Sequence, residues 1–356
     1  MKIALINDTH AGARGDNPLF NEYFFKFWEN TFFPYLEEHG IQKIVHLGDV
    51  VDRRKFINFV TLNSWRRRFF DVLEQKNISM DVIVGNHDVT YKNTNEINAM
   101  NELFERYNNI NVYTEPVMNE YAGTNIALIP WINSSNYEQS LQFMKDTPAQ
   151  ICFGHFEIAG FEMDRGNICH TGMNKETFDK FDVVLSGHFH HKSTDGNITY
   201  LGNQYQITWA DWGDDRGFHV FDTETRELTF VKNPYEMFHK INYDDATRDF
   251  EFWQSIDFDH WKDCYVKIVV AHKQNPYLFD NVIDRLYKAG VADIAVVEDF
   301  TDSSVELDEE IVNQAEDTMT ILNKYIDGLT LNVEPVKLKN IMKELYIESL
   351  NVEVTE

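Results

Sequence analysis

Five short apolar runs, each followed at once by polar residues, constrain the fold of this chain more than any other feature. The runs are residues 3–6, 44–47, 82–84, 151–153 and 183–185. Runs of this length that are rich in β-branched residues and bounded by glycine are typical of buried strands in a sheet covered on both faces. The sequence therefore predicts an α/β fold in which polar side chains gather where strands end.

The polar residues behind these runs carry carboxylate, imidazole and amide groups. They form the motifs Asp8-Thr9-His10, Gly48-Asp49-Val50-Val51-Asp52, Gly85-Asn86-His87-Asp88, Gly154-His155 and Gly187-His188-Phe189-His190. Loops at strand ends commonly carry the chemistry of a protein. In four motifs a glycine stands directly before the first of these polar residues, which allows the backbone to approach a bound group closely.

The donor types in these motifs favour a site for two metal ions. Oxygen and nitrogen donors without a thiolate suit Mn²⁺, Fe or Zn²⁺ better than Ca²⁺ or a cysteine-rich structural zinc. Seven side chains are too many for one tetrahedral ion but fit two ions that share a carboxylate. We expect two Mn²⁺ ions, with Mg²⁺, Fe or Zn²⁺ as substitutes. The predicted ligands are Asp8, His10, Asp49, Asn86, His155, His188 and His190.

In this order the five motifs resemble the signature of the calcineurin-like metallophosphoesterases. The resemblance implies that Asp49 bridges the two metals. It assigns Asp8, His10 and His190 to the first metal, and Asn86, His155 and His188 to the second. It also implies that His87 faces the scissile phosphate and its leaving oxygen, with the Asp52 carboxylate orienting it and Asp88 as an alternative orienting group.

The wider pattern resembles the SbcD-type nucleases, the nuclease subunits of complexes that process DNA double-strand breaks. The resemblance rests on the start of the chain, on Tyr200-Leu201-Gly202-Asn203, and on Arg216-Gly217-Phe218-His219-Val220. Residues 154–164 are most similar to the members encoded by T-even phages. This resemblance implies phosphodiester hydrolysis of DNA, an SMC-like coiled-coil ATPase as partner, and a homodimer within the complex. His191-Lys192 departs from the Arg-Pro that bacterial relatives often carry.

Two other functions are compatible with parts of the sequence. A phosphomonoesterase or protein phosphatase of the same superfamily is indicated by residues 48–53, which resemble the phosphatase sequence G-D-x-V-D-R-G until Arg54 replaces the final glycine. Against it, the third motif ends in Asp88 where those phosphatases carry glutamate. A non-catalytic scaffold is disfavoured because every predicted ligand position carries a residue that can bind a metal ion.

The net charge of −26 argues against tight DNA binding by this chain alone, because phosphate contacts usually come from basic residues. Basic side chains nevertheless cluster after the second motif, and Arg53, Arg54, Arg66 and Arg67 are the predicted DNA contacts. The triplet 66–68 fits a solvated helix face equally well. The charge balance favours a nuclease that borrows a DNA-binding surface from its partner.

Three cysteines make no disulfide framework and indicate a reducing compartment. The sequence shows neither a membrane-spanning apolar stretch nor an N-terminal signal segment. We therefore expect a cytoplasmic protein, in the host cytoplasm if the chain is phage-encoded, with no membrane contact.

The predicted organisation has three parts: a nuclease domain over residues 1–235, a capping domain over 240–300 and a helical segment over 301–356. In the first part, two stacked sheets are flanked by helices, predicted at 20–39, 61–75, 96–107 and 136–145. Strands at 126–129, 199–201 and 218–221 are expected to form a second, more antiparallel group. In the second part, residues 264–271, 276–289 and 293–297 predict one βαβ unit.

The last segment carries an apolar stripe that includes Leu338, Ile341 and Leu345. Such a stripe needs a covering surface. We expect it to dock on the ATPase partner, and packing on the capping domain is the alternative. Among the other histidines, His46 is expected in the core, whereas His191 either orients a ligand or lies at the surface.

Overall fold

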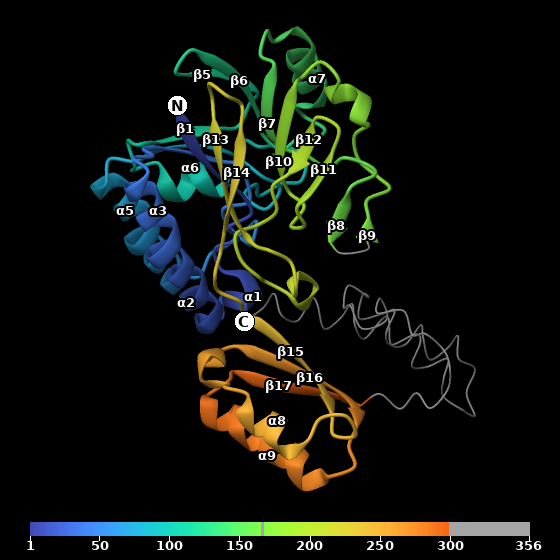
Figure 1. The fold of residues 1–356 in the computed structure, drawn as a ribbon. Coiled ribbons are helices and arrows are strands. Elements are labelled where there is room, and N and C mark those ends of the chain that lie inside the picture. The colour runs from blue at the N-terminus through green and yellow to red at the C-terminus, as the bar shows by residue number, and fades with distance from the viewer. Residues whose placement is uncertain (165–166, 299–356) are drawn as a thin grey trace, which may run out of the picture. The chain divides into compact units, whose positions relative to one another are not determined.

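Two six-stranded sheets stack face to face in the computed structural model, which describes residues 1–164 and 167–298 (Figure 1). These residues fall within one compact unit, Met1–Phe300. The predicted helical segment 301–356, with Leu338, Ile341 and Leu345, lies outside the described residues. Within the described part of the chain, no helix combines the length and the hydropathy that a membrane span requires.

The first sheet has the order β14-β13-β1-β2-β3-β4. Four of its strands run parallel to one another, and β13 and β14 add an antiparallel edge. Its strands are β1 (Lys2–Ile6), β2 (Lys43–His46), β3 (Ser79–Ile83), β4 (Ile110–Tyr113), β13 (Gly217–Asp222) and β14 (Leu228–Lys232).

The second sheet has the order β11-β12-β10-β7-β6-β5. Its four inner strands are parallel, and the two edge strands pair antiparallel. Its strands are β5 (Val117–Tyr121), β6 (Thr124–Ile129), β7 (Ile151–His155), β10 (Val183–Gly187), β11 (Ser193–Asp195) and β12 (Ile198–Tyr200).

The expected second, more antiparallel group of strands is wrong in two respects. The runs at 126–129 and 199–201 belong to β6 and β12, which pair parallel with β7 and β10. The run at 218–221 belongs to β13, which pairs antiparallel with β1 in the first sheet. Phe218 packs under the helices and Phe221 packs between the sheets. A strand buried on both faces carries no alternation from which its pairing direction could be predicted.

Alternating side chains of β1 show how the layers are divided. Ile3 and Leu5 point into the apolar layer between the two sheets, whereas Ala4 and Ile6 join the core under the helices. Successive side chains on a strand point to opposite faces, so an apolar residue at every position indicates a strand with both faces covered. A third cluster, which includes Met144 of α7 (Tyr137–Asp146), covers the outer face of the second sheet.

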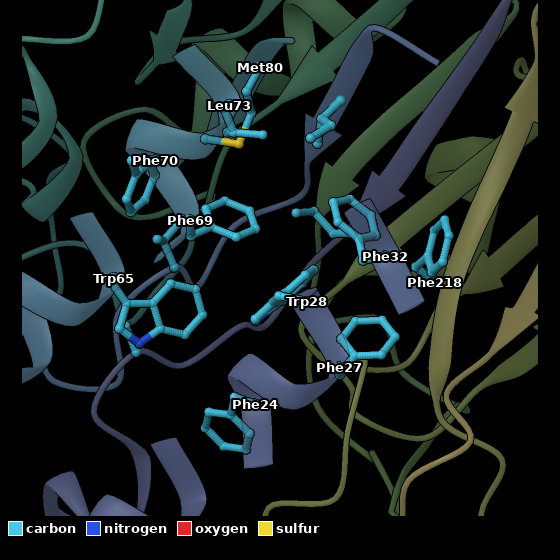
Figure 2. Packing of buried hydrophobic residues seen from close by; sticks show 14 of the residues in the cluster. Phe24, Phe27, Trp28, Phe32, Trp65, Phe69, Phe70, Leu73, Met80 and Phe218 are labelled. Atoms are coloured by element: carbon cyan, nitrogen blue, oxygen red, sulfur yellow. The ribbon is translucent and has the colours of Figure 1, made fainter. Parts of the chain in front are cut away.

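Aromatic side chains fill the core between the first sheet and its helices (Figure 2). Two helices each contain a π-helical segment in mid-course and correspond to the predictions at 20–39 and 61–75. The segments are α2 (Pro18–Phe27), η1 (Trp28–Phe32), α3 (Phe33–Glu38), α4 (Phe59–Trp65), η2 (Arg66–Phe70) and α5 (Asp71–Gln75). The helix predicted at 96–107 is the shorter α6 (Ala99–Phe104). It begins after Asn98, whose side chain caps it by accepting from the Asn101 amide.

The remaining elements of this part are short. They are α1 (Ala13–Asp16), the hairpin strands β8 (Glu162–Asp164) and β9 (Asn167–Ile168), and the 3₁₀ turns η3 (Lys175–Phe178) and η4 (Trp209–Asp211).

A three-stranded parallel sheet follows, with its own apolar core. The predicted βαβ unit corresponds to β16, α9 and β17, and the structure adds β15 and α8. Asn275 caps α9, Pro276 occupies its first turn, and Gly290 ends it in a left-handed conformation. The elements are β15 (Phe238–Asp244), α8 (Phe250–Ser255), η5 (Asp259–Trp261), β16 (Tyr265–His272), α9 (Pro276–Ala289) and β17 (Asp293–Glu298).

We predict that Phe32→Ala lowers the free energy of unfolding by about 3–5 kcal/mol, the usual cost of removing a buried aromatic side chain. Phe32 is fully buried, and its ring lies 4.9 Å from Trp28 and 4.8 Å from Phe218, centroid to centroid. Urea unfolding measures the change. Phe59→Ala is the control, because Phe59 is 84% exposed, and a loss of the same size there would contradict the argument.

Candidate metal centre

The seven predicted ligands come from both sheets and meet at one place. Asp8 and His10 follow β1, Asp49 follows β2 and Asn86 follows β3, whereas His155 ends β7, and His188 and His190 follow β10. Two groups of donor atoms result, each with all its atoms within 4.8 Å of one another. The groups are Asp8 with His10 and His190, and Asp49 with His155 and His188. A third group of possible donors joins His10 to Asp52 and His87, which are not predicted ligands.

Asn86 completes the second group. Its Oδ1 lies 2.9 Å from Nε2 of His155 and 2.9 Å from Nδ1 of His188. In the first group, Nε2 of His10 lies 3.0 Å from Nε2 of His190. Lone-pair donors that converge this closely suit a shared cation, and Asp8 Oδ1 is buried without a hydrogen-bond partner among the described residues. The donors therefore fit divalent metal ions of the type that accept mixed oxygen and nitrogen ligands.

The backbone at this site is held in an unusual conformation. Four predicted ligands have positive φ angles: Asp8 at 49°, His10 at 44°, Asp49 at 58° and His188 at 90°. Residues other than glycine rarely adopt positive φ angles, and each such residue costs on the order of 1–3 kcal/mol of conformational strain. Strain of this kind persists only where the surrounding structure imposes it, and it is common at functional sites.

Two glycines let the strand ends approach one another. A Cβ atom on Gly85 would collide with Asp49 Oδ1, and one on Gly48 would lie 2.6 Å from Nδ1 of His155. Gly48 also has a φ of +92°. At both positions the lack of a side chain permits close contact between the protein's own loops, whereas the expected close approach to a bound group stays a prediction.

Neighbouring groups determine which ring nitrogen faces the centre. Nδ1–H of His155 donates to the Leu47 carbonyl oxygen at 2.7 Å, which leaves Nε2 toward Asn86 and Asp49. Nε2 of His188 faces Glu157 at 3.7 Å, which leaves Nδ1 toward Asn86. Such contacts fix the tautomer and orientation of histidine ligands.

The position of Asp52 corrects one expected contact. Nδ1–H of His87 donates to the backbone carbonyl oxygen of Asp52 at 2.6 Å, not to its carboxylate. The Asp52 carboxylate lies 3.5 Å from Nδ1 of His10 instead. His87 is thus held by the main chain, because the turn after β2 brings the Asp52 carbonyl to the ring. Its own amide donates to Asp49 Oδ1 at 2.7 Å, which fixes the loop beside the donor groups.

Asp88 does not orient His87. Its fully buried carboxylate accepts hydrogen bonds from the amides of Asp49, Val50, Val51 and Gly85, at 2.8 to 3.1 Å. Burial, together with the Asp49 charge, raises the pKa of Asp88 to about 7 against the opposing effect of these amide donors. Asp88 therefore ties the loop after β2 to the loop after β3, and both loops carry predicted ligands.

Other predicted residues take different places. His46 is buried, as expected for a core residue, and its Nε2 lies 3.0 Å from the Thr9 hydroxyl. His191 faces Asp214 at 2.7 Å and Glu162 at 3.3 Å, so neither His188 nor His190 is its partner in these contacts. The buried Arg216 donates to the His190 carbonyl oxygen and supports that ligand from behind.

The predicted DNA contacts divide into two pairs. Arg53 and Arg54 line a surface pocket beside Val51 of the second motif, and Arg53 also pairs with Asp16 at 3.0 Å. Arg66 and Arg67 lie on η2, where the Arg66 guanidinium donates to the Leu103 carbonyl oxygen at 2.6 Å. The first pair thus follows directly from a motif that holds a predicted ligand, whereas the second belongs to a helix.

The sequence analysis assigned no role at this site to three residues that lie in it. Trp131, just after β6, has its ring centroid 5.3 Å from that of His188, and Glu157 and Arg216 contact ligand residues. Trp131 obeys the same rule as the motifs, because it stands directly behind an apolar strand. It was overlooked because an indole is not a metal ligand.

Without a bound metal, the negative charges of the cluster favour protonation of His10 and His155. Burial lowers the pKa of His10, but the Asp52 carboxylate 3.5 Å from its Nδ1 and the charges of Asp49 and Asp8 outweigh this and raise the pKa to about 9. Burial likewise opposes protonation of His155, and Asp49 with Asp8 raises its pKa to about 9. Burial and the neighbouring His10 hold the pKa of His190 well below its usual value.

We predict that metal binding at pH 7.5 releases about two protons, because His10 and His155 must be neutral to act as ligands. The affinity should rise with pH up to about 9, the pKa of both groups without metal, and level off above it. Titration calorimetry with Mn²⁺ in buffers of different ionisation enthalpy measures the release. Binding without proton release at pH 7.5 would show that His10 and His155 are already neutral before the metal binds and would contradict their raised pKa values.

Comparison with known proteins agrees with this geometry. A family model for calcineurin-like phosphoesterases matches residues 1–192. Exonuclease subunit 1 of Enterobacteria phage T4 is 30% identical over 352 residues, which cover 98% of this chain and 99% of that protein.

Two solved structures are also similar. One is a novel archaeal phosphodiesterase with 14% identity and a TM-score of 0.31, matched over 65% of this chain and 99% of that one. The other is a hypothetical protein from Thermus thermophilus with 13% identity and a TM-score of 0.35, matched over 66% and 98%. The family model spans all seven residues whose donor atoms converge, and the T4 relative spans nearly the whole chain: this chain belongs to the calcineurin-like phosphoesterase family.

Proposed function

We propose that this chain hydrolyses phosphodiester bonds of DNA as the metal-dependent nuclease subunit of a recombination or repair complex. The observation that carries the proposal is the pair of donor groups with Asp49 next to both. Asp49 Oδ2 lies 3.4 Å from Nε2 of His155 in one group, and the Asp49 carbonyl oxygen accepts from the amide of His10, a member of the other group, at 3.1 Å. Paired metal sites that share a carboxylate are common in phosphatases and nucleases. The relative in phage T4 is an exonuclease subunit, which supports a nucleic acid as the substrate and a place within a complex.

The residues present divide naturally between two ions, for which Mn²⁺ is our first choice. Asp8, His10 and His190 would hold one ion, Asn86, His155 and His188 the other, and Asp49 both. When bound, such ions supply Lewis acidity, which activates water at neutral pH and neutralises charge on phosphoryl oxygens. Glu157 and the Leu47 carbonyl keep the donor nitrogens of His188 and His155 directed inward.

His87 is suited to act on the leaving oxygen. Because Nδ1–H donates to the Asp52 carbonyl oxygen, Nε2 is the ring atom that can hold a proton for transfer. The ring lies edge-on to His10, with centroids 4.9 Å apart, so it borders the donor cluster. A proton delivered from Nε2 would stabilise the departing alkoxide, and the carbonyl contact would stabilise the ring in both protonation states.

Parallel assays on two substrates test the nuclease assignment against a phosphomonoesterase. We expect Mn²⁺-dependent release of nucleotides from linear DNA and little hydrolysis of p-nitrophenyl phosphate. Asp49→Asn should remove the activity, because Asp49 would contact both ions, and Glu120→Gln on the outer strand β5 is the control. Hydrolysis of p-nitrophenyl phosphate without cleavage of DNA would favour the monoesterase.

We predict that His87→Gln lowers turnover on DNA by roughly 10²–10⁴-fold, the range for removing a general acid, with Mn²⁺ binding unchanged. Glutamine keeps a polar group of similar length but cannot deliver a proton. Activity assays and Mn²⁺ calorimetry on the same preparation measure both properties. The exposed His39 provides the matched control His39→Gln, and a loss of metal binding in His87→Gln would make His87 a ligand instead.

DNA contacts are proposed first for Arg53 and Arg54 and second for Arg66 and Arg67. The first pair lines a pocket with Val51, beside the motif of Asp49 and Asp52, whereas Arg66 is already engaged by the Leu103 carbonyl oxygen. The net charge of −26 opposes tight DNA binding by this chain alone. We therefore also propose an SMC-like coiled-coil ATPase that supplies further DNA-binding surface. In addition, we propose that the chain forms a homodimer within the complex and that it is located in the cytoplasm.

We predict that deletion of residues 330–356 removes stimulation by the ATPase but spares metal-dependent activity on short single-stranded DNA. The stripe of Leu338, Ile341 and Leu345 lies far along the chain from every predicted ligand, and an apolar stripe requires a covering partner. Co-purification with the ATPase measures docking. Undiminished association of the truncated chain, or its failure to fold, would assign the stripe to this chain's own core.

A further inference from the structure

A groove beside the second donor group has an aromatic wall that the metal chemistry does not use. It is lined by Trp131, Tyr137, Phe156, Glu157, Met173 and His155. We propose that this groove binds the nucleobase of a nucleotide adjoining the scissile phosphate. The inference rests on the proposed nuclease function and adds a subsite for substrate recognition to it.

The groove adjoins the donor cluster. His155 belongs to both, and the Trp131 ring centroid lies 6.0 Å from that of His155 and 5.3 Å from that of His188. A phosphate bound at the donor groups would therefore bring the nucleoside attached to it to the mouth of the groove. A phosphate monoester without a large organic group would leave the groove empty.

The groove offers the chemistry that a base requires. Tyr137 is 49% exposed, and Trp131 and Met173 are partly exposed. Stacking of a base on an aromatic side chain contributes about 1–3 kcal/mol and tolerates any sequence. A thioether adapts its shape to an aromatic ring. The Glu157 carboxylate, whose Oε1 accepts from the Thr171 hydroxyl at 3.0 Å, adds an acceptor for the amino group of a base.

The main chain of Trp131 is held in place before any ligand binds. The Trp131 amide donates to the Val84 carbonyl oxygen at 2.8 Å. The Trp131 carbonyl oxygen accepts from the side chains of Asn95 and Asn136 at 2.9 and 3.1 Å, and both asparagines are buried. A platform fixed in this way loses little conformational entropy on binding.

The part of the lining that contains Met173 is held just as closely. The Met173 amide donates to the Glu157 carbonyl oxygen at 2.8 Å. The neighbouring Gly172 has a φ of +97°, and a Cβ atom there would collide with the same carbonyl oxygen. Only glycine permits this approach, so the chain is built to bring Met173 against the segment that follows His155.

A purely structural role for Trp131 makes a different prediction. Its ring touches His155 and His188, so its removal could displace these residues and slow the hydrolysis of every substrate equally. Recognition of a base slows only substrates that carry the base. Single-stranded oligonucleotides with one cleavable bond, either intact or abasic at one flanking nucleotide, separate the two roles.

We expect Trp131→Ala to lower kcat/KM on the intact oligonucleotide by about 5- to 150-fold, which corresponds to the loss of one stacked base. On an oligonucleotide that lacks the base at the nucleotide bound in the groove, the same variant should differ little from the wild-type chain. Tyr137→Ala should show the same pattern with a smaller loss, because about half of the Tyr137 side chain is exposed to solvent. Tyr277→Ala, at a side chain 87% exposed in α9, is the matched control and should have no effect.

Three results would overturn the subsite while leaving the proposed nuclease intact. They are an equal loss for Trp131→Ala on intact and abasic substrates, a wild-type chain that cleaves both equally well, and normal cleavage of the intact substrate by both variants. A wild-type chain that cleaves no DNA would instead overturn the nuclease assignment, and the subsite with it. Mn²⁺ calorimetry on Trp131→Ala, with binding expected to be unchanged, provides a readout independent of activity.

Discussion

Polar groups at the ends of buried strands must find hydrogen-bond partners, and here they find them across the two sheets. His155 of β7 donates to the Leu47 carbonyl oxygen behind β2, Trp131 behind β6 donates to Val84 behind β3, and the His188 amide donates to Asp8 Oδ2. An unpaired buried group costs about 1–3 kcal/mol. These contacts fix the alignment of the sheets, and that alignment brings the donors of one sheet against those of the other.

The same alignment concentrates negative charge and strain at one place. Asp88 holds the loops after β2 and β3 through four amide donors, so Asp49 is presented with a positive φ angle. Carboxylates placed beside buried imidazoles attract protons, which is why the pKa values of His10 and His155 both rise to about 9. Divalent cations can replace these protons. Protons and divalent metal ions therefore compete for the same negatively charged site.

The sequence was sufficient to predict the strands that precede the motifs, most helices and the polar residues that converge at the strand ends, because each motif directly follows a buried strand. It did not predict β4, β5, β11, β14 or β15. It could not predict how similar runs divide between two sheets, and β13 was assigned to the wrong group, because apolar runs buried on both faces look alike whichever neighbours they pair with. Main-chain contacts were equally hidden. The bond expected between the Asp52 carboxylate and His87 is made by the Asp52 carbonyl oxygen, which any residue could supply.

Trp131 belongs to the site although an indole is not a metal ligand. It stands at a strand end like the predicted ligands, its amide takes part in the cross-sheet bonding, and its ring borders two of them. The hydrogen bonds that align the donors thus also place an aromatic surface at a fixed distance from them. Because one set of contacts positions both, a phosphate and the base attached to it can be bound by the same rigid edge of the sheets. Any change that shifts the edge should then affect chemistry and substrate recognition together, whereas a change confined to the indole should affect recognition alone.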